Sequence, residues 1–340
     1  MIINRTSTQE PKTRNKGIIR ASYAQTLAAL PFSAVSLASI STMKKLNKLS
    51  PEDTITIKKS ISQALTDTGL REKGTKAIFV DTFKSKKEIP EYITNLFSAD
   101  KLPKADEKVI KACSKEVEHF KNKKLYKSLF SKFQGDFEAD PEFKKIIDRV
   151  SSVIPLFQVK SGSNAFYKLH GNAIVVPNKK LTPSAFHEMG HALNANYSKV
   201  GKFLQKNRKL AMSVAGLVGL VGLCTKKKAD DETPNKGIGK VTHFIKKNAG
   251  VLSFASMMPV VMEEAMATMK GNKIASQMLD KKLLNKVKLT NAIGLSTYLL
   301  GALSVGVSTA FAIKVKDNIQ AKHEAKVAAK HQAKLAAQQK

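Results

Sequence analysis

The 340-residue sequence contains no tryptophan and only two cysteines, and aromatic residues make up 6% of it. Cys113 and Cys224 lie far apart, and neither has a partner at metal-site spacing. This argues against a disulfide framework and against a cysteine-ligated metal. The scarcity of aromatic residues and the lack of recognisable RNA- or DNA-binding motifs argue against a base-stacking module. We therefore expect no specific nucleic-acid partner.

Acidic residues are also scarce. The chain has 27 of them against 58 lysines and arginines, and its net charge is +31. A charge of this size favours a polyanionic neighbour, which is either nucleic acid or the anionic face of a membrane. Because nucleic-acid motifs are lacking, we favour the membrane and expect lipids as partners.

Several long stretches contain no charge at all. The clearest is residues 289–313, a run of 25 uncharged residues bounded by lysines that predicts a transmembrane helix. Within residues 210–262, two shorter apolar runs flank a polar loop at 226–247. They predict a membrane hairpin, which we favour, or two helices of a soluble core. Residues 21–43 are open to three interpretations: a membrane helix, a buried soluble helix or a secretory signal.

These runs predict a multi-pass protein of an inner or plasma membrane. Residues 314–340 form a helical, Lys-rich tail, for which the positive-inside rule favours the cytoplasmic side. The topology of the other segments and the oligomeric state are left open by the sequence.

The region before the membrane segments is Lys-rich and patterned. In residues 44–150, apolar side chains recur at helical spacing, and Ser50-Pro51 and Asp140-Pro141 are typical helix starts. Residues 153–159 and 172–177 predict short strands separated by a turn. An edge strand at this place could hold an extended peptide by backbone hydrogen bonds.

An H-E-x-x-H motif follows these strands, as His187-Glu188-Met-Gly-His191. Thr182 as N-cap and Pro183 as first helical residue predict the start of a helix. Residues four apart share one face of a helix, so His187 and His191 can bind one metal ion. Glu188 lies one step round the helix, where it can reach a zinc-activated water. The motif predicts a zinc site with Glu188 as general base.

A catalytic zinc needs a third protein ligand and one open position. The metzincin arrangement is excluded, because Asn194 and Tyr197 occupy the positions where it requires Gly and His. A carboxylate on a later helix is the best remaining candidate. An apolar run ends in Glu263-Glu264, and the spacing leaves both of these carboxylates open as ligands.

Three segments resemble membrane-bound gluzincins of the HtpX and CAAX-prenyl-protease type and the YugP-like neutral zinc metallopeptidases. They are Gly162-x-Asn-Ala-Phe166, the H-E-x-x-H helix and Glu264-x-x-Ala-Thr268, within residues 160–275. The resemblance implies a mainly α protein with a zincin-like catalytic unit of short β-strands and the H-E-x-x-H helix, together with transmembrane helices. It implies Glu264 as third ligand, with Glu263 as the alternative. HtpX-type enzymes have Asp where Thr268 stands, so the YugP-like pattern fits better.

These interpretations divide the chain into four segments in sequence order. They are a basic leader with an apolar segment (1–43), a helical region (44–150), a zinc metallopeptidase-like domain that includes the apolar hairpin 210–262 (151–288), and a transmembrane helix with a basic tail (289–340).

The function expected from this reasoning is that of a membrane-anchored zinc metalloendopeptidase acting on protein or peptide substrates. Zn²⁺ held by His187, His191 and Glu264 would activate a water, and Glu188 would take its proton and return it to the leaving amine. The alternative is a non-enzymatic, membrane-associated scaffold or interaction protein with a degenerate metal site. A charge-driven nucleic-acid-binding protein is the third candidate.

Overall fold

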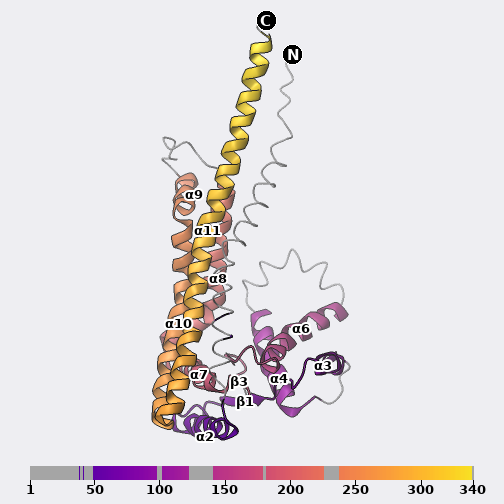
Figure 1. The fold of residues 1–340 in the computed structure, drawn as a ribbon, viewed down its shortest axis with the longest axis vertical. Helices are drawn as coiled ribbons and strands as arrows, with labels where there is room; N and C mark the ends of the chain where they lie inside the picture. The colour runs from indigo at the N-terminus through magenta and orange to yellow at the C-terminus, as the bar shows by residue number, and fades with distance from the viewer. Residues whose placement is uncertain are drawn as a thin grey trace. The chain divides into compact units, whose positions relative to one another are not determined.

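The protein is mainly helical in the computed structural model, which describes residues 49–97, 102–121, 141–178, 181–225 and 237–338, together with 38 and 41 (Figure 1). The three interpretations of residues 21–43 concern positions outside the described residues, apart from 38 and 41. The chain divides into two compact units. We call residues 38–206 and 262–296 the sheet unit, and residues 1–37, 207–261 and 297–340 the helical unit.

A three-stranded sheet forms the centre of the sheet unit. Its strands are β1 (Lys76–Val80), β2 (Phe166–Lys168) and β3 (Ala173–Pro177), in the order β1-β3-β2. β3 runs parallel to β1 and antiparallel to β2. The predicted strand at 172–177 is therefore confirmed as β3, whereas the sequence patterns did not reveal β1 or β2.

Asn172 closes the turn between β2 and β3. It adopts a left-handed backbone conformation with φ of 44°, which asparagine tolerates better than most residues. Its side-chain Oδ1 accepts hydrogen bonds from the hydroxyls of Thr75 and Tyr167, each at 2.8 Å. Its Nδ2 donates to the Lys73 carbonyl at 2.7 Å. One side chain therefore joins the β2–β3 hairpin to the segment that leads into β1.

The predicted strand at 153–159 is wrong, because these residues belong to helix α6 (Pro141–Lys160). Val153, Leu156 and Val159 are buried and spaced three apart, which is the period of a helix face rather than of a strand. They pack in one cluster with Val109 and other residues of helix α4 (Lys104–Lys121). Tertiary packing against α4 thus overrides the β-branched composition of the run.

Helices cover both faces of the sheet, and the alternation of β3 side chains decides which residues meet which helix. Ile174 and Val176 join the cluster that contains residues of helix α2 (Pro51–Asp67) and helix α7 (Ala185–Tyr197). Ala173 and Val175 join the cluster that contains residues of α4 and α6. Helix α3 (Glu88–Phe97) completes the described helices before α4.

Two of the predicted helix starts are confirmed. α2 begins at Pro51, and the Ser50 hydroxyl accepts a hydrogen bond from the Asp53 backbone N–H at 3.0 Å, as expected of an N-cap. α6 begins at Pro141. The N-cap predicted at Thr182 is wrong: Leu181 caps a short 3₁₀ turn at Thr182–Ser184, and α7 follows it directly.

α7 and the second half of α10 (Ala249–Met278) approach each other without intervening side chains. Gly190 of α7 lies directly against the backbone of Ala267, and Gly271 of α10 lies directly against the backbone of Phe186. A Cβ at either glycine would overlap backbone atoms. This contact fixes the side chains of α7 and α10 relative to each other.

Three helices are long and apolar enough to cross a membrane: α8 (Lys199–Cys224), α10 and α11 (Lys281–Gln338). The predicted span at 289–313 lies within α11, and the two apolar runs of the predicted hairpin lie in α8 and α10. These three helices indicate a membrane protein. The polar loop predicted at 226–247 is wrong in its second half, which forms helix α9 (Gly237–Lys247).

Small residues let the helices of the helical unit pack closely. A Cβ at Gly250 would lie 2.8 Å from that of Ala310, and one at Gly306 would lie 2.9 Å from that of Phe254. Close approach through glycine and alanine is typical of helices that associate within lipid. It supports the assignment of these helices to a membrane.

The contact at Gly190 can be tested by substitution. We expect Gly190→Ala to destabilise the protein by about 1–3 kcal/mol, because the added methyl group must displace the Ala267 backbone. Thermal unfolding followed by circular dichroism would show a lower midpoint. Gly216→Ala is the matched control, since a Cβ at Gly216 meets nothing within 4 Å. Alanine favours helix over glycine, so the control should unfold no earlier than the wild type, and equal effects of the two changes would contradict the packing argument.

Candidate metal centre

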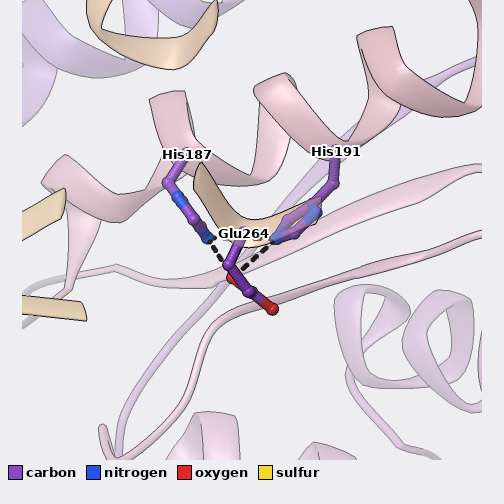
Figure 2. A group of neighbouring side chains, drawn as sticks. All are labelled: His187, His191 and Glu264. Atoms are coloured by element: carbon purple, nitrogen blue, oxygen red, sulfur yellow. Dashed lines mark hydrogen bonds and ion pairs between the residues drawn. The ribbon is translucent and has the colours of Figure 1, made fainter. Parts of the chain in front are cut away.

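His187 and His191 lie one turn apart on α7, and Glu264 comes from α10 (Figure 2). The Nε2 atoms of the two histidines are 3.0 Å apart. Oε2 of Glu264 lies 3.0 Å from Nε2 of His187 and 3.4 Å from Nε2 of His191. Figure 2 shows both imidazoles pointing at the Glu264 carboxylate. The structure thus brings together the three residues that were predicted as ligands.

This geometry and donor set suit a divalent metal ion. Ligand atoms about 2.0–2.2 Å from a tetrahedral zinc lie roughly 3.3–3.6 Å from one another, and the three observed separations fall within or slightly below that range. Two imidazoles and one carboxylate are common zinc ligands, although iron and manganese accept the same set. The site is enclosed, since the side chains of His187, His191 and Glu264 are 12%, 8% and 0% exposed. Three ligands leave a fourth position for water or substrate.

The Nδ1 atoms of both histidines, on the far side of each ring from Glu264, also have hydrogen-bonding partners. Nδ1 of His187 lies 3.1 Å from the Thr268 hydroxyl, and Nδ1 of His191 lies 2.8 Å from Oε1 of Glu263. Such partners fix the tautomer and the orientation of a ligand imidazole. The two adjacent carboxylates therefore occupy different positions: Glu264 faces both Nε2 atoms, and Glu263 faces the far side of His191.

Glu263 is itself held by two amides. Its Oε1 accepts from Nδ2 of Asn194 at 3.2 Å and from Nε2 of Gln205 at 2.8 Å. Gln205 also donates to the His191 carbonyl at 2.8 Å. Sequence reasoning missed both amide residues. Asn194 carries a usable signal, because it lies seven residues after His187 on the same helix face. Gln205 lies on the next helix, and its sequence position carries no signal.

Glu188 is buried beside the two histidines on α7. Burial raises the pKa of its carboxyl group above the ordinary value, although the neighbouring imidazoles of His191 and His187 act in the opposite direction. Burial alone would lower the pKa of His191, but its contacts with Glu263 and Glu264 raise that pKa well above the ordinary value. A proton therefore competes with a metal ion for His191.

Two further polar residues of the sheet unit, His170 and Tyr197, lie outside this cluster. His170, in the turn after β2, stacks on His119 of α4 with ring centroids 3.5 Å apart. Tyr197 is 50% exposed, and its hydroxyl lies near Gly69. Among the described residues, His187, His191 and Glu264 form the one group of three or more histidine, cysteine or acidic side chains with metal-site spacing.

No protein-family model, curated protein sequence or solved structure matches the chain. The gluzincin resemblance therefore stays a prediction based on its three motif segments. The case for a metal centre depends on the geometry described above.

The neighbouring carboxylates provide a matched pair of substitutions. We expect Glu264→Gln to abolish stoichiometric Zn²⁺ binding, because the amide replaces a charged ligand. Glu263→Gln should weaken binding by about 10–100-fold, as for other residues that orient a ligand histidine. Competition titration against a chromophoric chelator measures both effects. A larger loss for Glu263→Gln than for Glu264→Gln would exchange the roles assigned to the two residues.

Metal binding should also depend on pH. His191 must lose its proton to bind a metal, and its two carboxylate neighbours favour the protonated form. We therefore expect weaker Zn²⁺ binding at roughly pH 6 than at roughly pH 8. The same chelator competition measures this difference, and equal affinity at the two pH values would contradict it.

Proposed function

We propose that the protein is a membrane-anchored, zinc-dependent endopeptidase of the gluzincin type. One observation carries the proposal: three ligand atoms from H-E-x-x-H and a distant carboxylate converge within 4.8 Å of one another, with Glu188 buried next to them. The motif alone specifies two ligands. The third ligand, Glu264, follows His191 by 73 positions in the chain. Its convergence with the two histidines supports a metal site rather than a chance match to the motif.

His187, His191 and Glu264 would hold the zinc ion, and Glu263 and Thr268 would orient the two imidazoles. A zinc ion bound there would lower the pKa of water and stabilise negative charge on a substrate carbonyl oxygen. Glu188 would act as general base and then as general acid: it takes a proton from the attacking water and returns it to the leaving amine. Its raised pKa supports this double role, because a carboxyl group nearer neutrality both accepts and releases protons efficiently.

The sheet provides a place for the substrate backbone. β2 is an edge strand, so one side of its backbone is not paired within the sheet. β2 and β3 both contact α7, which carries the two histidines. An extended peptide added to the free edge of β2 would be held by main-chain hydrogen bonds near α7. This transfers to β2 the role that the sequence suggested for the pair of strands at 153–159 and 172–177.

The apolar helices support the membrane anchor. α10 supplies Glu263, Glu264 and Thr268, and it is also one of the three helices long and apolar enough to span a bilayer. The proposed third ligand and the two residues that orient the imidazoles therefore lie on the same helix as a candidate membrane anchor. Unfolded or membrane-proximal polypeptides are the substrate class that fits this arrangement.

The proposal is tested with the full chain purified in nanodiscs and loaded with Zn²⁺. Wild-type protein should cleave an unfolded polypeptide, with cleavage sites identified by mass spectrometry. Glu188→Gln should lose at least about 100-fold of the rate, because a general base contributes roughly 10²–10⁴-fold. It should keep one zinc per chain, since Glu188 is not a ligand.

His187→Ala provides the matched comparison, because it should lose zinc and cleavage together. A wild-type protein that binds one zinc but cleaves no polypeptide would favour the non-enzymatic scaffold. Unchanged cleavage by Glu188→Gln would remove the proposed mechanism.

A further inference from the structure

Helix α9 (Gly237–Lys247) lies between the candidate spans α8 and α10 and has a divided surface. At 100° per residue, its apolar residues Ile238, Val241, Phe244 and Ile245 fall on one side, and its three lysines fall elsewhere. The helix contains no acidic residue. Its eleven residues therefore form a short, basic, amphipathic helix.

The apolar side of α9 faces outward. No residue of α9 is buried, and Ile238, Val241 and Phe244 are 83%, 56% and 58% exposed. In contrast, the Lys246 side chain is only 9% exposed, and its ammonium group pairs with the Asp317 carboxylate of α11 at 2.8 Å. The usual orientation of an amphipathic helix in a water-soluble protein is thus reversed, which implies that something apolar covers the outer side.

Contacts within the helical unit place α9 near the last residues of α8, the first residues of α10 and the segment around Asp317 of α11. Lys316 of α11 donates from Nζ to the carbonyl of Thr225, just after α8, at 2.6 Å. Ala249, the first residue of α10, packs with Leu223 and Ile313. The apolar parts of α8, α10 and α11 therefore end close together, in a region that also contains charged contacts. In the chain, α9 lies between the end of α8 and the start of α10.

We infer that α9 is an interfacial lipid-binding helix that inserts its apolar side into the membrane and binds anionic phospholipid headgroups through Lys240 and Lys247. Such helices lie about 5–10 Å deep at the boundary between headgroups and acyl chains. Both lysines are exposed and lie along the same edge of the apolar side, from which their side chains can extend to phosphates.

Lipid fits this surface better than a second copy of the chain. α9 leads directly into the candidate membrane helix α10. In the most apolar window of α8, a further candidate membrane helix, only 17% of the residues are buried, so apolar surface beyond α9 also needs a lipid environment. A pair of α9 helices packed through their apolar sides would also bring lysines of like charge together without any acidic partner on the helix.

The lack of tryptophan in the sequence makes a direct test possible. In Phe244→Trp the full chain carries a single tryptophan on the outer side of α9. The protein is placed in nanodiscs of phosphatidylcholine, with or without phosphatidylglycerol, in which the acyl chains are brominated or unmodified. We expect blue-shifted emission, of which brominated lipids quench roughly half or more in the presence of phosphatidylglycerol. His243→Trp, on the polar and partly buried side, is the matched control and should show little quenching by brominated lipids.

The lysine contribution is measured in the same system. Adding Lys240→Gln and Lys247→Gln to Phe244→Trp should remove the extra quenching that phosphatidylglycerol produces. A blue-shifted emission that brominated lipids do not quench would show that protein covers this side, and a water-like emission would show that nothing does; either result overturns the inference. Quenching that is independent of phosphatidylglycerol and of both lysines would overturn its anionic part. The far-UV circular dichroism spectrum and the thermal unfolding midpoint of each variant, both expected to match the wild type, verify folding.

Discussion

The contact between α7 and α10 at Gly190 and Ala267 is the constraint on which the rest of the site depends. Two helices that touch through backbone atoms cannot slide or separate without losing that contact. The H-E-x-x-H face of α7 is thereby held opposite the acidic turn of α10. The ligand triad, the two carboxylate positions and the partners of both imidazoles all follow from this one close approach.

The sheet and the helices that cover it also hold α7 in position, through the side of α7 that carries its buried apolar residues. Alternating side chains of β3 join both clusters of the sheet unit, and one of these clusters contains Ala185, Phe186 and Met189 of α7. α7 thus has a buried apolar surface toward the sheet and a polar surface toward α10. A helix of thirteen residues is positioned by packing on both sides rather than by its own propensity.

The sequence predicted those features that are determined within a single helix. The motif at His187–His191, the helix starts at Pro51 and Pro141 and the long apolar runs are each readable within one helix. The strand predicted at 153–159 failed because packing against α4 decides that segment, and β1 escaped notice because its single short run lies in a helical region. Thr268 and Glu263 were noticed in sequence, but their assignment to His187 and His191 requires the helix pairing. Gln205 was not foreseeable, because only tertiary contact connects it to Glu263.

Glu263 and Glu264 are consecutive residues, so their side chains leave α10 about 100° apart. The identity of the carboxylate that faces the two imidazoles is therefore a function of the rotation of α10 about its own axis. The same helix also contains a run apolar enough for a bilayer. A turn of roughly one residue would place Glu263 where Glu264 now faces the imidazoles. The candidate metal centre therefore requires one rotation of α10, and the backbone contact of Gly190 with Ala267 maintains it.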